Sequence, residues 1–469
     1  METGGEVKRD MWGYAVVTSS DSCISAIDSY YHQVLSYGRN RAVILEGPLH
    51  DPDCVLANIL AAYFLFHSDR SKSLSHLASA SARLDHASSY EALVFEAVSS
   101  LLVDDRDDDV AIDLHFKLLK GYPKDLVSLK RAQLLCFYLG RPDVSLNLVE
   151  QVLGENQQES YIYGMLAFPL LELGRMADAE RAANKGFDIN KDDFWSQHAL
   201  CHIFQYDCRF KEAVDFMEAC SSSWNSCSSF MYTHNWWHVA VCYLEGHSPL
   251  QKVLEVYDNH IWKELQRSDA DCEEVYLNAL GLLLRVYVRG QIEQVGDRLK
   301  VLATILADQS NWHIEWLLDL LALWALSSTR QTKKAEDLLK AMKSRTYLMG
   351  RKKQQSMQRA ILLAEALYEY GRGNYERAFE CLGPDFDAND CKMIGASDEQ
   401  LDIFNEVWFS VLLNTGHVSK AIEVIEKRVN KREGIPFLWS LLEKAYATEG
   451  RVEASVAGEK AKALEIAYF

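Results

Sequence analysis

Apolar residues recur at steps of three and four along most of the chain, which is the spacing of one face of an α-helix. A clear example runs from Leu126 to Leu139 and is followed at once by Gly140-Arg141-Pro142. A glycine after the last apolar position ends a helix, and a proline is tolerated in the first turn of the next one. The pattern therefore predicts a helix, a tight turn and a second helix.

This helix-turn-helix unit repeats at a fixed interval. Arg141, Arg175 and Arg209 each lie between two apolar helical patterns and are 34 residues apart, as are Gly416 and Gly450 near the end of the chain. A period of 34 residues built from two helices is typical of tetratricopeptide repeats. We therefore expect an all-α fold, a tetratricopeptide-like right-handed helical solenoid of antiparallel helix pairs.

The regularity of the period varies along the chain and suggests four segments. Residues 124–262 hold the regular repeats and two pairs of histidines, although the unit that begins near residue 229 is a few residues out of step. Helical spacing continues around this segment with a blurred period. We expect a divergent N-terminal helical layer at 1–123, divergent helical repeats at 263–350, and C-terminal repeats with a cap at 351–469.

The composition of the chain limits the cellular location and the classes of partner that we expect. The 469 residues carry a formal net charge of −18, with 48% hydrophobic and 25% charged residues. A net negative charge repels nucleic acid and anionic lipid, which bind through clustered Lys and Arg. The N-terminus lacks the features of a signal peptide, and no uncharged apolar stretch reaches about 18 residues. We expect a cytoplasmic protein with no nucleic-acid partner and no membrane insertion.

Motifs of the common enzyme classes are missing. The sequence contains no glycine-rich phosphate loop, no Gly-x-Ser-x-Gly elbow and no His-Glu-x-x-His helix. Its eleven cysteines lie mostly inside apolar helical patterns without a Cys-x-x-Cys pair, which favours reduced, packed thiols. Whether any reaction is catalysed stays open, and the sequence favours a protein that binds over one that catalyses.

The most unusual local feature is two pairs of histidines at helical spacing. His198 and His202 lie four apart in one first helix, and His234 and His238 lie four apart in the next. Residues at i and i+4 share one helix face, which allows two imidazoles to hold one ligand or metal ion. Because first helices of successive repeats run side by side, we expect the two pairs to face each other.

Three roles for these histidines are open. They could be packed core residues, they could contact a ligand in the concave groove, or they could bind a divalent metal ion. The leading hypothesis is an interaction module whose groove binds a protein, a peptide or a small polar ligand, without a cofactor. The alternative is a metal-binding protein or a metal-assisted enzyme. Further groove candidates are Asn235, Trp237, Asp258 and His313.

A loop interrupts the repeat period between residues 384 and 399. Its end, from Ile394 to Gln400, precedes a helical pattern, so Ser397 or Asp398 is a candidate helix cap. Long insertions in repeat arrays are also common binding sites. Both interpretations stay open for the loop residues Gly395, Ser397, Asp398 and Gln400.

An acidic run breaks the helical pattern at residues 104–109. The glycine and the terminal glutamate of an EF-hand calcium loop are missing from it. We therefore interpret the run as a solvated loop whose carboxylates lie at the start of the next helix.

Several segments together resemble the tetratricopeptide repeat protein 38 family over nearly the whole chain. The most distinctive are the His-Ala-x-x-His segment at 198–202 and the His-Asn-Trp-Trp-His segment at 234–238, supported by residues 10–19, 51–52, 166–172, 257–258 and 395–402. The resemblance implies an all-helical cytoplasmic repeat protein and a shared role for the four histidines, with no reaction attached. Two departures stand out. Gln205 and Tyr206 follow the second histidine, where the family tends to have an acidic residue and a methionine. The run Tyr276-Leu277-Asn278 lies near a position where the family favours aspartate.

Overall fold

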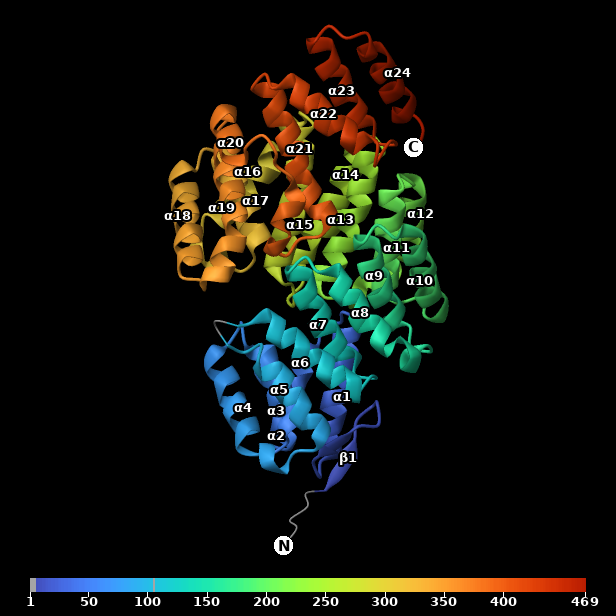
Figure 1. Cartoon of the computed structure of the whole chain (residues 1–469), viewed down its shortest axis with the longest axis vertical. Coiled ribbons are helices and arrows are strands. Elements are labelled where there is room, and N and C mark those ends of the chain that lie inside the picture. The colour runs from blue at the N-terminus through green and yellow to red at the C-terminus, as the bar shows by residue number, and fades with distance from the viewer. Residues whose placement is uncertain (1–5, 104–105) are drawn as a thin grey trace. The chain divides into compact units, whose positions relative to one another are not determined.

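The computed structural model describes residues 6–103 and 106–469, and helices account for most of them (Figure 1). The predicted all-α, tetratricopeptide-like architecture of antiparallel helix pairs is confirmed. The sequence did not reveal a short antiparallel hairpin, β1 (Val7–Arg9) and β2 (Ala15–Val17), in which Val7 lies opposite Val17. A turn at residues 10–13 connects these two strands.

Six helices precede the regular pairs. Helices α3 and α4 pack against each other, and α5 packs on α3 and α6. The six are α1 (Asp21–Leu35), α2 (Glu46–His50), α3 (Val55–Leu65), α4 (Arg70–Ala82), α5 (Ser89–Ser99) and α6 (Asp108–Gly121).

Nine helix pairs follow within the residues that the structure describes. Each pair consists of a first helix, a tight turn and a second helix. The pairs are α7 (Leu126–Tyr138) with α8 (Pro142–Leu153), α9 (Tyr161–Glu172) with α10 (Met176–Ile189), α11 (Phe194–Tyr206) with α12 (Phe210–Cys220), α13 (Ser229–Glu245) with α14 (Leu250–Val256), α15 (Cys272–Val288) with α16 (Gly296–Leu306), α17 (Trp316–Ser328) with α18 (Thr332–Tyr347), α19 (Arg351–Gly371) with α20 (Tyr375–Leu382), α21 (Asp398–Asn414) with α22 (Val418–Val429), and α23 (Pro436–Thr448) with α24 (Glu453–Glu465).

One left-handed backbone residue marks the turn of every pair. These residues are separated by 34, 34, 39, 43, 40, 43, 43 and 34 positions, so the pairs continue where the period in the sequence blurs. Glycine adopts a positive φ without strain, whereas another residue there costs roughly 1 kcal/mol. The turn residues are Gly140, Gly174, Cys208, His247, Gly290, Arg330, Gly373, Gly416 and Gly450. Gly174 and Cys208 occupy equivalent turn positions, with φ angles of 75° and 58°.

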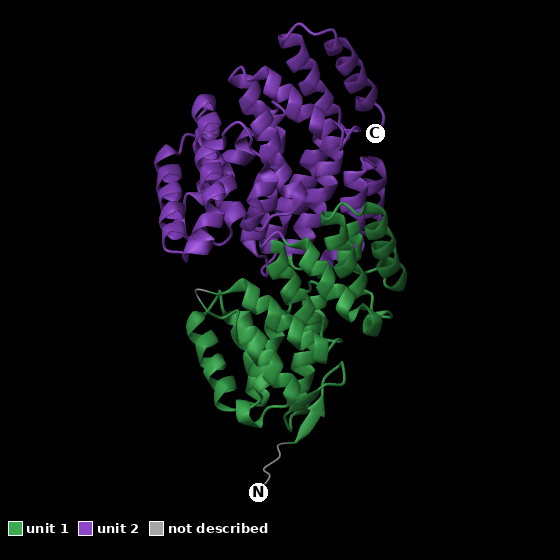
Figure 2. Ribbon diagram, in the orientation of Figure 1, with its two compact units in different colours: residues 1–137, 141–199, 226–228 green, residues 138–140, 200–225, 229–469 purple. Residues whose placement is uncertain are grey.

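The chain divides into two compact units (Figure 2). Unit 1 comprises residues 1–137, 141–199 and 226–228, and unit 2 comprises residues 138–140, 200–225 and 229–469. The boundary falls inside the continuous helix α11, between Ala199 and Leu200. The division into four segments that the sequence suggests stays a prediction.

Two further expectations concern the state of the cysteines and the presence of membrane-spanning helices. All eleven cysteines are free thiols, as the lack of a Cys-x-x-Cys pair predicts. Within residues 6–103 and 106–469, no helix combines the length and the apolar character needed to cross a bilayer. The cytoplasmic location stays a prediction.

The end of the acidic run caps a helix, as predicted. Asp107 is the N-cap of α6, and its carboxylate accepts hydrogen bonds from the backbone N–H groups of Asp109 and Val110. Negative charge at this end of a helix is favourable because the first N–H groups lack intrahelical partners. Residues 104–105 of the run lie outside the described part of the chain.

A buried carboxylate in the β1–β2 turn gives unit 1 a testable pH dependence. One oxygen of Asp10 accepts hydrogen bonds from the backbone N–H groups of Trp12 and Tyr14, while the side chain is 4% exposed. Burial raises the pKa of Asp10 from 3.8 to about 7, against the two backbone hydrogen bonds. Between pH 4 and pH 7 the carboxyl group of Asp10 therefore keeps its proton in the folded state and loses it in the unfolded state.

We expect the free energy of unfolding to fall as pH rises from 4 to 7, because the folded protein must then hold a buried charge. The substitution Asp10→Asn should remove that loss and stabilise the protein at pH 8 by on the order of 3 kcal/mol. Urea unfolding at pH 5 and pH 8 measures the difference. The exposed Asp85→Asn is the control, and equal pH slopes for Asp10→Asn and the wild type would refute the expectation.

Candidate functional site

Helices α11 and α13 bring the predicted histidines together. His202 lies near the end of α11, and His234 and His238 lie one turn apart on α13, all three within unit 2. His198 belongs to unit 1 but lies one turn before His202 on the same continuous helix, so helix geometry fixes it relative to His202.

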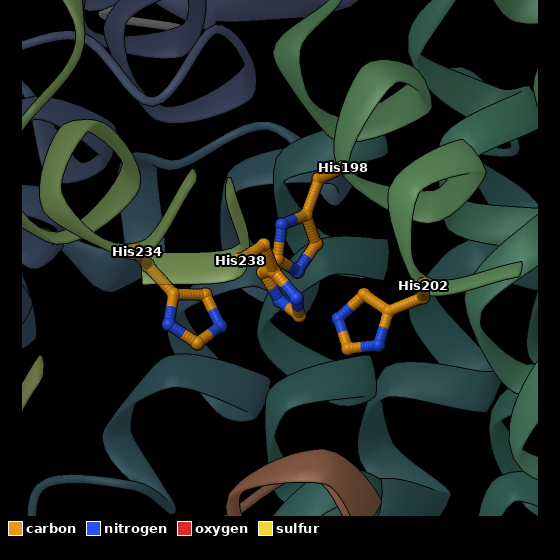
Figure 3. A group of neighbouring side chains, drawn as sticks. All are labelled: His198, His202, His234 and His238. Atoms are coloured by element: carbon orange, nitrogen blue, oxygen red, sulfur yellow. The ribbon is translucent and has the colours of Figure 1, made fainter. Parts of the chain in front are cut away.

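Figure 3 shows the rings of His202 and His234 turned toward the ring of His238. The ring centroids of His202 and His238 are 4.3 Å apart, and those of His234 and His238 are 4.8 Å apart. His202, His234 and His238 each offer one ring nitrogen, and these nitrogens all lie within 4.8 Å of one another.

The imidazoles are in the interior of the helical array. The exposed fractions of His198, His202, His234 and His238 are 2%, 1%, 3% and 0%. Asn235 and Trp237, the neighbouring groove candidates, are 0% and 2% exposed. This burial does not support the expected contact with a peptide lying in an open groove.

The side-chain amide of Gln205 contacts Nδ1 of His238. Nδ1 of His238 lies 2.9 Å from Oε1 of Gln205, and the amide nitrogen of Gln205 donates to the carboxylate of Glu245 at 3.2 Å. A carboxylate only accepts hydrogen bonds, so it orients the amide and leaves Oε1 to accept from the imidazole. Nδ1 of His238 therefore carries the proton, and Nε2 carries the lone pair.

The side-chain amide of Asn278 contacts Nδ1 of His234 in the same way. Nδ1 of His234 lies 2.9 Å from Oδ1 of Asn278, whose amide nitrogen donates to the backbone carbonyl of Glu274 and to the hydroxyl of Thr233. The amide orientation again places the proton on Nδ1 of His234. Burial lowers the pKa of His234 to about 4, so its imidazole is neutral near pH 7.

His202 has a charged outer partner. Its Nδ1 lies 2.7 Å from a carboxylate oxygen of Glu399, a side chain that is 10% exposed. Burial alone raises the pKa of Glu399, but the adjacent His202 outweighs this effect and the pKa falls to about 2. The carboxylate and Nδ1 of His202 form a short ion-pair contact whose angles are not those of a hydrogen bond.

In these three contacts, an oxygen atom lies next to Nδ1 of a histidine. Metal-binding histidines in proteins usually have such a partner at the ring nitrogen that does not bind the metal. A histidine that ligates through one nitrogen nearly always donates its other N–H to a carboxylate, a carbonyl or an amide oxygen. Two nitrogens on one tetrahedral zinc ion lie roughly 3.4 Å apart, given bonds of about 2.0–2.1 Å. The observed limit of 4.8 Å therefore requires side-chain shifts of about 1 Å on binding.

Aromatic rings fix the plane of one imidazole. His234 is stacked between Phe230 and Trp237, with centroid distances of 5.5 Å and 5.2 Å and interplanar angles of 15° and 10°. This stacking limits rotation of the His234 ring about the side-chain torsions χ1 and χ2. The predicted groove residue Trp237 thus positions His234.

The remaining groove candidates lie elsewhere in unit 2. Asp258 forms an ion pair with Arg298 at 2.6 Å, and His313 is paired with Asp319 at 2.9 Å. Neither belongs to the group of converging histidine nitrogens. Each has a local partner, which accounts for its position without a ligand.

The loop that interrupts the period contributes a residue next to the ones that the sequence singled out. Ser397 caps α21, and the side chain of Gln400 returns a hydrogen bond to the backbone of Ser397, which confirms the cap. Gly395 has a φ of 77°, and Asp398 pairs with Lys392 at 2.9 Å. A binding role for these loop residues stays a prediction. The contact with the histidines comes instead from Glu399.

Sequence reasoning missed the three outer partners of the histidines as site residues. Gln205 and Asn278 were visible only as departures from the family pattern, and both prove to hold an imidazole. Glu399 lies in the loop segment that the sequence singled out, but nothing connected it with His202, which is 197 positions away. Only helix packing brings them together.

A buried network of charges lies next to the site in unit 2. Arg432 pairs with Glu245 at 2.7 Å, Arg289 pairs with Glu406 at 2.6 Å, and Arg428 pairs with Asp402 at 2.5 Å. Arg432 also donates to the backbone carbonyl of Gln205 at 2.8 Å. Glu245, Asp402 and Glu406 lie close enough to form an acidic group, but their arginine partners neutralise it.

No protein-family model matches the chain. Among solved structures it is similar to the human IFIT1 dimer with m7Gppp-AAAA, at 14% identity and a TM-score of 0.39, covering 96% of this chain and 91% of that one. A monomeric IFIT1 mutant with Gppp-AAAA is matched at 13% identity and a TM-score of 0.38, covering 95% and 91%. At these values the likeness assigns no ligand to this chain, and the resemblance to the tetratricopeptide repeat protein 38 family stays a prediction.

One sequence-based expectation is corrected by these neighbours. The acidic composition led us to exclude nucleic acid as a partner, yet the matched helical structures are complexes with nucleic acid. Net charge sums over the whole chain and does not describe the charge of one local surface. The exclusion of nucleic acid is therefore withdrawn.

Proposed function

We propose that this helical-repeat protein binds a divalent transition-metal ion of the zinc class through His202, His234 and His238, joined by His198 from the same helix as His202. The observation that carries the proposal is the set of outer contacts. Nδ1 of each of the first three histidines lies next to an oxygen atom, and one ring nitrogen from each of them lies within 4.8 Å of the others.

The donor set favours particular metals. Imidazole nitrogens suit Zn²⁺, Co²⁺, Ni²⁺ and Cu²⁺, whereas Mg²⁺ and Ca²⁺ prefer oxygen ligands. A site without solvent exposure favours an ion held by protein ligands over one that acts on a substrate, because a catalytic ion keeps an open position. The metal-binding alternative is therefore better supported than an enzyme or a peptide-binding groove.

Titration of the metal-free protein with Co²⁺ tests the proposal directly. The wild type should bind one equivalent and develop the visible absorption of cobalt in a tetrahedral nitrogen environment. The double variant His202→Asn/His238→Asn should lose this absorption while keeping the helical circular dichroism spectrum.

A matched control removes two histidines outside the group. His115 is buried in unit 1 with Nδ1 at 2.7 Å from the carbonyl of Ala111, and His260 is stacked on Trp236 at 3.6 Å. The variant His115→Asn/His260→Asn should bind Co²⁺ like the wild type. A wild type that shows no saturable cobalt absorption, or equal loss in both variants, would contradict the proposal.

A further inference from the structure

The three outer partners of the histidines differ in charge. Gln205 and Asn278 offer neutral amide oxygens to His238 and His234, whereas Glu399 offers a carboxylate to His202. A negative charge 2.7 Å from Nδ1 of His202 acts on the ring electrostatically, which a neutral amide oxygen does much less. It also makes the opposite nitrogen of the ring a better electron donor. Glu399 should therefore affect metal binding more than either amide.

The segment that interrupts the repeat period delivers this carboxylate. After the 3₁₀ helix at Ala388–Ile394, the chain turns at Gly395, where an added Cβ would come within 2.0 Å of the ring of Tyr138. Ser397 then starts α21, so Glu399 lies in the first helical turn. A carboxylate is stabilised at this end of a helix by the unpaired N–H groups and the helix dipole.

Glu399 is anchored through its backbone as well. The guanidinium of Arg285, which is 1% exposed, donates to the backbone carbonyl of Glu399. The side chain of Glu399 is thereby held in place while its carboxylate points at His202. The nearby acids Glu245 and Glu406 are paired with arginines, so their charge is already compensated.

A metal ion held only by neutral imidazoles keeps its full charge in a poorly solvated interior, where an unpaired charge is costly. A fixed carboxylate one imidazole away offsets part of that cost, since Coulomb energy is larger at low dielectric than in water. Glu399 is the outer partner that supplies such a charge.

We infer that Glu399 is a positioning residue for the metal site, which orients His202 and sets the affinity of the site without touching the ion. The inference rests on the proposed metal-binding function. It assigns a role to the insertion at residues 384–399, whose last residue completes the outer contacts from a helix far away in the sequence.

The test compares Glu399→Gln with a matched variant of another buried carboxylate. Asp319 is 1% exposed and accepts from Nδ1 of His313 at 2.9 Å, so Asp319→Asn removes the same kind of pair outside the site. Competition between Co²⁺ and a chromophoric chelator gives the dissociation constant of each protein. We expect Glu399→Gln to weaken Co²⁺ binding about 10- to 100-fold and Asp319→Asn to leave it unchanged.

Glu399→Asp separates charge from packing. It keeps the carboxylate but moves it back by one methylene, so its affinity should fall less than that of Glu399→Gln. Equal affinities of Glu399→Gln and the wild type would overturn the inference, as would equal losses in Glu399→Gln and Glu399→Asp. If Glu399→Gln does not fold, Glu399→Asp decides alone, because an affinity equal to that of the wild type overturns the positioning role.

The outcomes distinguish this inference from the proposed function. A wild type that binds no Co²⁺ removes both. A wild type that binds Co²⁺ with variants of unchanged affinity removes only the role of Glu399 and leaves the histidine site intact.

Discussion

Zinc is expected to stabilise the protein against urea, and the gain should disappear when two histidines are replaced. At a free Zn²⁺ concentration one hundred times the dissociation constant, the free energy of unfolding should rise by about 2.7 kcal/mol. The physical reason is that the folded chain holds His202, His234 and His238 around one point, whereas the unfolded chain does not. Urea unfolding followed by circular dichroism, with and without Zn²⁺, measures the gain.

The double variant His202→Asn/His238→Asn supplies the comparison. Its unfolding curve should be the same with Zn²⁺ as with a chelator. A zinc-dependent gain that survives in this variant would mean that the ion binds elsewhere, for example at surface histidines. Mg²⁺ at the same concentration serves as a further control, since it binds imidazole poorly.

The second large effect is expected from breaking the buried ion pair beside the site. Arg432 and Glu245 are 3% and 1% exposed, and the guanidinium donates to both carboxylate oxygens at 3.2 Å and 2.7 Å. Against the effect of burial, Glu245 raises the pKa of Arg432. We expect Arg432→Ala to reduce the free energy of unfolding by about 3 kcal/mol, because buried Glu245 loses its close partner and keeps only the amide of Gln205 and the more distant Arg285, at 3.9 Å.

Urea midpoints of two further variants provide the comparison for this value. Arg451 pairs with Glu449 at the surface, so Arg451→Ala should cost no more than about 1 kcal/mol. The double variant Glu245→Met/Arg432→Met should be more stable than Arg432→Ala, because apolar side chains of similar size leave no unpaired charge. A cost below about 1 kcal/mol for Arg432→Ala itself would show that water reaches Glu245.

The helix pairs were predictable because their determinants are local. The apolar spacing around Leu129 and the turn at Gly140 define one unit within about 35 residues, and the same chemistry recurs at Gly174. After residue 260 the period blurs because the intervals between turns lengthen to about 40 residues. The left-handed turns themselves persist, for example at Gly290 and Arg330.

The site was predictable in part. The spacing of His234 and His238 on one helix follows from 3.6 residues per turn, and the neighbouring first helix carries His202. Whether these rings face solvent or each other depends on how α11 and α13 pack, and helical spacing alone does not determine that. In the structure these rings are buried, and a role for them in an open groove stays a prediction.

The sequence by itself determined the elements of this protein, namely helices in pairs, their turn residues and the two histidine pairs, because each depends on contacts within one or two helical turns. Only the tertiary structure decided the surroundings of the histidines. Glu399 reaches His202 from 197 positions away, and Arg432 reaches Glu245 from 187 positions away. The physical reason is that side chains on separate helices meet only when packing brings those helices together, and no local spacing in the sequence encodes that contact.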